Sequence, residues 1–193
     1  HGLVLRDAAI ERAALGIINS TFGCAGQRCM ALPVLVVEDA CAAEFLHYLL
    51  KFAKERKVGC AYHPETELGP VVSLERKKAI ENWITKGVEE GAELLLDGRN
   101  YTVPGFENGY FIGPTIFDHV KPGMAVGEIE IFGPVTSIKR VSNFEEGLAM
   151  MNASPFANGS CIFTQNGYYA REFAQRTHAG MVGVNVGIPV PIS

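Results

Sequence analysis

Short apolar runs alternate with helical patterns along most of this 193-residue chain, and that alternation constrains its fold more than any other feature. Parallel strands need long crossover connections, whereas antiparallel strands can be joined by tight turns. Segments of helical periodicity, of roughly 10 to 15 residues, lie between most of the runs and can serve as crossovers. The sequence therefore predicts an α/β fold with a largely parallel sheet flanked by helices. The predicted strands are 34–37, 93–98, 114–120, 134–141, 160–165 and 180–187.

Candidate capping residues predict where the helices begin. Asp7 and Asp39 each precede an apolar pattern of helical spacing, and Ser73 precedes a third such pattern. Asn143 stands three residues before Glu146, which is the spacing of a capping box. The inner faces expected for the first three helices are Ile10, Ala13, Ala14, Ile17 and Ile18, then Ala42, Phe45, Leu46, Leu49 and Ala53, then Ile80, Trp83, Ile84 and Val88.

No repeat, linker or low-complexity tract divides the chain, so residues 1–193 are predicted to form one domain. The first residues contain neither a methionine nor the pattern of a signal peptide. The last residues form an apolar run interrupted by prolines, which would need a packing partner. We therefore expect the chain to be a fragment of a longer protein.

The charge and the cysteine content limit which binding partners and which cellular compartment are expected. The net charge is −4, with 17 basic and 21 acidic residues spread along the chain, so neither nucleic acid nor a membrane surface is expected as a partner. No apolar run approaches the length of a membrane span. The five cysteines are odd in number and unclustered, which favours a reducing compartment, the cytoplasm or the mitochondrial matrix. Four matches to the N-glycosylation pattern argue weakly in the other direction.

Two of the cysteines lie in the glycine-punctuated stretch FGCAGQRC, between a predicted helix and a predicted strand. A zinc site would need four ligands at short spacings, and no metal site is expected because the histidines are scattered. A redox pair of the C-x-x-C type is absent. A nucleophile fits better: Gly23 and Gly26 let a substrate approach the backbone, and Arg28 could favour the thiolate at Cys29. The alternative is that Cys29 is a small buried apolar side chain.

Five motifs follow one another along the whole chain: GQRC at 26–29, LGP at 68–70, NGYFIGPT at 108–115, EIFGP at 130–134 and GMVGVN at 180–185. In sequence and order they resemble the motifs of the aldehyde dehydrogenase superfamily. The surroundings of the first motif, AGQRCMAL, and the closing GVNVGIPVP resemble its CoA-acylating methylmalonate-semialdehyde (malonate-semialdehyde) dehydrogenase branch. The resemblance implies the catalytic domain of such an enzyme, without most of its coenzyme-binding domain and without its C-terminal oligomerisation segment.

This resemblance implies a mechanism centred on Cys29. The thiolate would attack the aldehyde to give a thiohemiacetal, and hydride transfer to NAD would leave a thioester. In the branch resembled here, coenzyme A takes the acyl group after a carboxylate is lost as carbon dioxide. The Cys29 N–H and an Asn of the missing domain would bind the oxyanion. The complete enzyme is expected to act on a small-molecule semialdehyde as a homo-oligomer, a dimer or a tetramer.

The resemblance also implies roles for four other residues. Arg28 would bind the substrate carboxylate, unless it makes only a structural ion pair. Asn185 would close the substrate tunnel, unless its amide satisfies backbone groups at a strand end. Glu130 would accept hydrogen bonds from the nicotinamide ribose, the alternative being a solvated carboxylate. Phe132 would position the nicotinamide ring, the alternative being a role in the core.

Two functional alternatives remain open in the sequence. A hydrolytic aldehyde dehydrogenase would pass the acyl group to water, and a non-catalytic fragment would serve only as a folding or interaction module. The general-base glutamate of hydrolytic members would lie before His1, so this chain does not contain its position. Cys24 stands where many family members have Asn, so a hydrogen-bonding scheme from that position to the nucleophile is not assumed.

Overall fold

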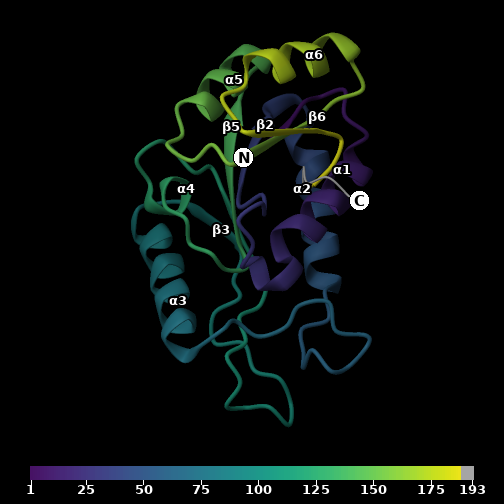
Figure 1. Cartoon of the computed structure of the whole chain (residues 1–193). Coiled ribbons are helices and arrows are strands. Elements are labelled where there is room, and N and C mark those ends of the chain that lie inside the picture. The colour runs from purple at the N-terminus through teal and green to yellow at the C-terminus, as the bar shows by residue number, and fades with distance from the viewer. Residues whose placement is uncertain (188–193) are drawn as a thin grey trace.

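The computed structural model describes residues 1–187, which form one seven-stranded sheet with helices on both faces (Figure 1). The strand order is β3-β4-β5-β2-β1-β6-β7. All neighbouring pairs are parallel except β3 with β4, which is antiparallel. The α/β prediction with a largely parallel sheet is confirmed. The strands are β1 (Gly2–Val4), β2 (Val34–Glu38), β3 (Glu93–Leu96), β4 (Thr115–Asp118), β5 (Val135–Val141), β6 (Gly159–Phe163) and β7 (Met181–Val184).

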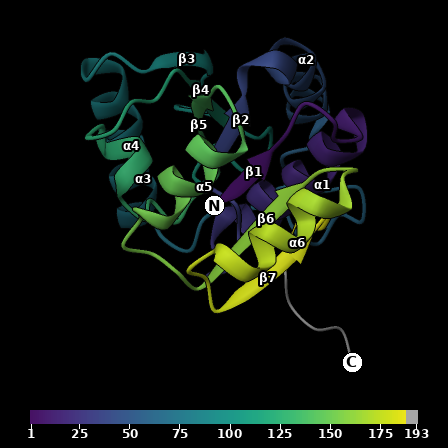
Figure 2. The same ribbon diagram turned by 90° about the horizontal axis from the view of Figure 1, so that it is seen from above.

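Two clusters of buried side chains fill the space between the sheet and its helices. Successive residues of a strand point to opposite faces, so Val4 joins the cluster under α1 and α2, whereas Leu3 joins the cluster under α5 and α6. Figure 2 shows these two pairs of helices on different sides of the sheet. The helices are α1 (Ile10–Phe22), α2 (Asp39–Glu55), α3 (Leu74–Glu89), α4 (Ala125–Glu128), α5 (Phe144–Asn152) and α6 (Gly167–Arg176), and a 3₁₀ turn, η1 (Gly23–Gly26), follows α1.

Of the four predicted helix N-caps, two are confirmed and two are wrong. Ser73 and Asn143 cap α3 and α5, because each side-chain oxygen accepts a hydrogen bond from a backbone N–H of the first turn. The prediction for Asp7 is wrong: α1 starts after Ala9, and the Asp7 carboxylate instead accepts hydrogen bonds from Thr164 Oγ1 at 2.8 and 2.9 Å. The prediction for Asp39 is also wrong, since it is the first residue of α2 and makes no capping bond.

The sequence analysis did not predict strand β1 or helix α4, and it wrongly placed Val88 in the core. Strand β1 has only three residues, too few for a period-2 pattern to be recognised, yet it lies near the centre of the sheet. Helix α4 has only four residues. Val88 is 43% exposed, because Gly87 is the residue of that turn that faces the Val126 and Phe117 side chains. The predicted inner faces of α1 and α2 are otherwise buried or half-buried.

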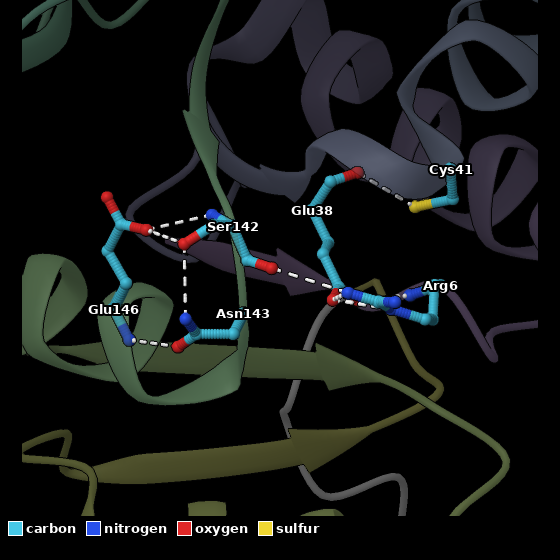
Figure 3. A network of polar contacts seen from close by, with 6 residues as sticks. All are labelled: Arg6, Glu38, Cys41, Ser142, Asn143 and Glu146. Atoms are coloured by element: carbon cyan, nitrogen blue, oxygen red, sulfur yellow. Dashed lines mark hydrogen bonds and ion pairs between the residues drawn. The ribbon is translucent and has the colours of Figure 1, made fainter.

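A polar network ties the carboxyl-terminal ends of β1, β2 and β5 together (Figure 3). The buried Glu38 carboxylate accepts hydrogen bonds from the backbone N–H and the guanidinium of Arg6, and Arg6 Nη2 also donates to Ser142 O at 3.3 Å. Next to it, Glu146 accepts from the Ser142 hydroxyl at 2.6 Å and from its N–H at 2.8 Å. These hydrogen bonds lower the pKa of Glu146. The carboxyl-terminal ends of these three strands are thus joined to one another by hydrogen bonds.

Among residues 1–187, no helix combines the length and the apolar character that crossing a bilayer requires.

Candidate active site

The segments that precede four neighbouring strands meet at a pocket on the amino-terminal edge of the sheet. Strands β5, β2, β1 and β6 are parallel neighbours, so the residues before each of them lie at the same edge. The pocket has a volume of about 270 Å³. Its walls are residues from segments 26–34, 127–132 and 154–159, and His1. The pocket therefore brings the GQRC and EIFGP motifs together.

The chain leaves α1 through a left-handed turn. Cys24 and Ala25 have φ values of 52° and 55°, and Gly26 follows with a φ of 68°. Non-glycine residues rarely adopt this region, at a cost of roughly 1–2 kcal/mol each, so the surrounding packing must hold the turn in place. Part of that support is a hydrogen bond of 3.0 Å from the Gln27 N–H to Cys24 O.

Contacts with distant segments fix the rest of this loop. A Cβ atom added at Gly26 would overlap the carbonyl group of Gly133 and lie 3.0 Å from the nitrogen of Pro134. Gln27 Oε1 accepts a hydrogen bond of 3.1 Å from the Val72 N–H. The loop that carries the predicted nucleophile is therefore in direct contact with the loop that carries the predicted coenzyme residues.

Cys29 lies in this pocket as an exposed free thiol. The carbonyls of both peptide groups that flank its Cα atom are hydrogen-bonded: Arg28 O accepts from the Ala31 N–H at 3.2 Å, and Cys29 O accepts from Asn158 Nδ2 at 3.3 Å. Within the described residues, the Cys29 N–H has no hydrogen-bond partner. An exposed thiol beside a free backbone donor can serve as a nucleophile next to half of an oxyanion hole.

The other cysteines differ from Cys29 in burial or in position. Burial raises the pKa of Cys41 and of Cys161 to about 11, so both remain thiols at neutral pH. Cys60 is half-buried in a different part of the fold, and Cys24 is exposed on the turn after α1. None of these four is among the residues that line the pocket of Cys29.

Arg28 lies at the pocket, but its guanidinium binds the end of α1. Nε donates to Gly23 O at 3.2 Å and Nη2 donates to Asn19 O at 3.1 Å. A Cβ atom at Gly23 would overlap this guanidinium, so the glycine leaves the space that Arg28 occupies. Arg28 therefore has a structural role, but it acts through hydrogen bonds to backbone carbonyl groups and not through the ion pair considered in the sequence analysis. Its role in carboxylate binding stays a prediction.

Glu130 and Phe132 line the same pocket as Cys29. Glu130 is exposed, and its carboxylate has no hydrogen-bond partner among residues 1–187, so it can accept bonds from hydroxyl groups. Phe132 is half-buried and has a φ of 56°. The segment between them is held by a 2.7 Å hydrogen bond from Arg76 Nη2 to Ile131 O. Both coenzyme assignments remain predictions.

A buried lysine supports the start of the same segment. Lys139 is only 6% exposed, and its Nζ donates to Glu128 Oε1 at 2.9 Å. This hydrogen bond from the ammonium group, together with its charge, holds the pKa of Glu128 below its usual value although partial burial opposes the shift. Glu128 remains a charged acceptor that fixes the chain just before Glu130.

Asn185 follows β7 and is not among the residues that line the pocket of Cys29. Its amide oxygen accepts from the Thr164 N–H at 3.0 Å, and its amide nitrogen donates to Thr164 O at 2.9 Å. This is the arrangement expected of a strand-end amide that satisfies backbone groups. The substrate-binding role of Asn185 stays a prediction. Residues 188–193, which complete the closing motif, lie outside the described residues.

One group of side chains has the proximity expected of metal ligands. The ligand atoms of Glu93, Asp118 and His119 lie within 4.8 Å of one another. Both Asp118 oxygens, however, accept hydrogen bonds from the Arg140 guanidinium, at 2.8 and 2.6 Å. Burial is the largest single influence and acts to raise the pKa of Asp118, but these bonds, a hydrogen bond from the His119 N–H and the charge of Arg140 together lower the pKa. Asp118 is therefore the acidic partner of an internal ion pair.

The sequence did not predict the wall that segment 154–159 contributes to the pocket. Asn158 stood out in the sequence only as a match to the glycosylation pattern, and nothing there singled out Phe156, which is 53% exposed. A usable signal was nevertheless present. The residues that precede a strand lie at the same edge as those that precede its parallel neighbours, so the segment before 160–165 was a candidate neighbour of Cys29.

Comparisons with known proteins show the family of this chain. The model of the aldehyde dehydrogenase family matches residues 1–193, and the chain therefore belongs to that family. Its whole length is 47% identical to malonate-semialdehyde dehydrogenase 2 of Oceanobacillus iheyensis and 45% identical to malonate-semialdehyde dehydrogenase of Bacillus velezensis. The chain spans only 40% and 39% of the lengths of these two relatives.

Solved structures of similar proteins have the same fold as this chain. A putative methylmalonate-semialdehyde dehydrogenase from Sinorhizobium meliloti, complexed with NAD, superposes with a TM-score of 0.97 at 40% identity. Methylmalonate-semialdehyde dehydrogenase (DddC) from Oceanimonas doudoroffii superposes with a TM-score of 0.96 at 36% identity. Each match covers all of this chain and 39% or 40% of the other. The fold expected from the family resemblance is confirmed.

Proposed function

We propose that this chain is the catalytic domain of an NAD-dependent dehydrogenase that oxidises a carboxylate-bearing semialdehyde and transfers the acyl group to coenzyme A. The observation that carries the proposal is the position of Cys29: an exposed thiol, whose N–H has no hydrogen-bond partner among residues 1–187, in a pocket shared with Glu130 and Phe132. The names of the malonate-semialdehyde dehydrogenase relatives support the substrate class.

The residues of this chain would carry out the acyl-forming half of the reaction. The Cys29 thiolate adds to the aldehyde carbon, and its own N–H donates to the oxygen that becomes negative. Loss of hydride from the carbon then leaves an acyl group bound to Cys29 as a thioester. Arg28 is proposed to bind the substrate carboxylate with the guanidinium donors that its bonds to the end of α1 leave free. Asn185 is proposed to help close the substrate tunnel.

The pocket residues fit the nicotinamide half of NAD, which accepts the hydride when bound. The Glu130 carboxylate, which has no hydrogen-bond partner within the described part of the chain, can accept hydrogen bonds from two ribose hydroxyls, and an aromatic side chain such as Phe132 can support a flat ring. The similar structure from Sinorhizobium meliloti is complexed with NAD, which favours this cofactor. The remaining coenzyme contacts are assigned to a domain that precedes His1.

Coenzyme A is proposed as the acyl acceptor, by analogy with the acylating branch. First the substrate carboxylate, which is β to the thioester carbonyl, would leave as carbon dioxide, and the resulting enolate carbon would take up a proton. The thiol of coenzyme A would then attack the thioester carbonyl, the bond from that carbon to Cys29 Sγ would break, and the free thiol of Cys29 would be regenerated. Water is the competing acceptor, and it would make the protein a hydrolytic aldehyde dehydrogenase. The complete protein is further proposed to be a dimer or a tetramer of identical chains in the cytoplasm or the mitochondrial matrix.

The test uses the complete protein with NAD, malonate semialdehyde and coenzyme A. We expect NADH formation together with an acyl-CoA product identified by mass spectrometry, and loss of both in Cys29→Ser. NADH formation with only a free acid, in the presence of coenzyme A, would favour the hydrolytic alternative. No NADH from any semialdehyde would favour a non-catalytic module and overturn the proposal.

A further inference from the structure

We infer that Asn158 is a positioning residue for the nucleophile: its side-chain amide fixes the peptide group between Cys29 and Met30 and thereby aims the thiol and the N–H of Cys29. This inference rests on the proposed function, because it assigns Asn158 a role in the reaction of Cys29. The starting observation is the 3.3 Å hydrogen bond from Asn158 Nδ2 to Cys29 O, which joins residues on two different walls of the pocket.

The backbone of Asn158 is itself firmly held. Asn158 O accepts a hydrogen bond of 3.1 Å from the Met181 N–H, and Ala157 O accepts one of 2.8 Å from the Gly180 N–H. These bonds attach the segment before β6 to the start of β7 and do not involve the Asn158 side chain. The amide of Asn158 therefore extends from an anchored backbone to the nucleophile loop.

The nucleophile loop needs an external support of this kind. Cys29 belongs to no helix or strand, and the turn that precedes it contains three consecutive residues with positive φ. Of the two peptide groups that flank Cys29, the first is held inside the loop, by Ala31 N–H to Arg28 O. Within the described residues, Asn158 gives Cys29 O its hydrogen-bond donor. Without this bond, the second peptide group could rotate.

Rotation of that peptide group would change the directions in which the side chain and the N–H of Cys29 point. The direction of the Cα–Cβ bond of Cys29 depends on both flanking peptide planes, and the Cβ carries the attacking sulfur. The N–H donor must also point at the position of the developing oxyanion, within a tolerance of a few tenths of an ångström. Loss of the Asn158 amide should therefore lower kcat more than it weakens substrate binding.

The experiment compares two substitutions of Asn158 with a matched control in the complete protein. Asn158→Ala removes the amide, and Asn158→Asp keeps the shape but loses the donor. The control, Asn152→Asp, lies in the same α5–β6 region, where its Nδ2 donates to Arg176 O at 2.9 Å, and it is not among the residues of the pocket. NADH formation under saturating substrates, KM for the aldehyde, and the rate of Cys29 alkylation are measured.

We expect both Asn158 variants to lose roughly tenfold in kcat, with a smaller change in KM and a loss of melting temperature no larger than that of the control. Cys29 alkylation should slow in both, whereas the control should lose thermal stability without losing kcat. An unchanged kcat in Asn158→Ala, an equal loss in the control, or failure of both Asn158 variants to fold would overturn the inference. A wild-type protein without NADH formation would contradict the proposed function instead, so the two failures are distinguishable.

Discussion

Gly26 and Gly133 are in backbone contact, so that a side chain at Gly26 would overlap the carbonyl group of Gly133. Gly26 also has a φ of 68°, in the left-handed region that only glycine adopts without cost. Gly26 belongs to the GQRC motif and Gly133 to the EIFGP motif, two of the five motifs that suggested the family. The contact explains the glycine at position 26, whereas a Cβ atom at Gly133 would instead overlap the Ile80 side chain. The loops that carry Cys29 and Glu130 thus approach each other closely here.

Gly26→Ala tests the need for this contact. The substitution should cost about 1–2 kcal/mol for the positive φ and about 1–3 kcal/mol more for the overlap. The overlap should also displace the loop and slow alkylation of Cys29. Thermal unfolding of the complete protein and the alkylation rate measure the two effects.

Gly105→Ala is the matched control for this prediction. Gly105 has a φ of 80°, but a Cβ atom built there meets no other atom within 4 Å. It should therefore show only the backbone cost, with Cys29 alkylation unchanged. Equal losses at the two glycines would mean that the contact with Gly133 can relax and does not shape the site.

The sequence predicted the sheet and the longer helices because their hydrophobic periodicity extends over several residues. It failed for β1, whose three residues carry no detectable period, and for Asp7, whose carboxylate binds Thr164 across the fold rather than the helix next to it. The motif led to the prediction that Cys29 is the nucleophile, whereas the sequence did not suggest a role for Asn158, because its partner Cys29 is distant in sequence. Local patterns do not contain such long-range pairings.

Cys29 should be alkylated before Cys41 and Cys161 in the folded protein. With a pKa of about 11, only about one molecule in a thousand has a thiolate at either buried site at pH 8. Substoichiometric iodoacetamide followed by peptide mapping should therefore label Cys29 first. Raising the pH toward 11 should increase labelling of the buried pair only as far as access permits. Cys24, which is also exposed, is the informative competitor, and faster labelling there would count against an activated Cys29.

The 193-residue chain purified alone should form no NADH from aldehydes, although it carries Cys29. It contains no glycine-rich dinucleotide fingerprint, and the two residues proposed to contact NAD, Glu130 and Phe132, are assigned to its nicotinamide half. An absorbance assay with malonate semialdehyde and NAD checks this, with the complete protein as the positive control. Steady NADH formation by the chain alone would show that its own residues suffice for coenzyme binding.

Arg28→Lys in the complete protein separates the two roles of this side chain. Lysine keeps a positive charge near Cys29 but cannot reproduce the bidentate geometry of a guanidinium on a carboxylate. If Arg28 binds the substrate carboxylate, kcat/KM should fall roughly 10- to 100-fold more for malonate semialdehyde than for propanal. If Arg28 acts only through its bonds to Gly23 O and Asn19 O, the loop shifts for every substrate and both aldehydes lose activity in equal proportion. Equal losses would thus remove the carboxylate-binding assignment and leave Arg28 as the clamp between the nucleophile loop and the end of α1.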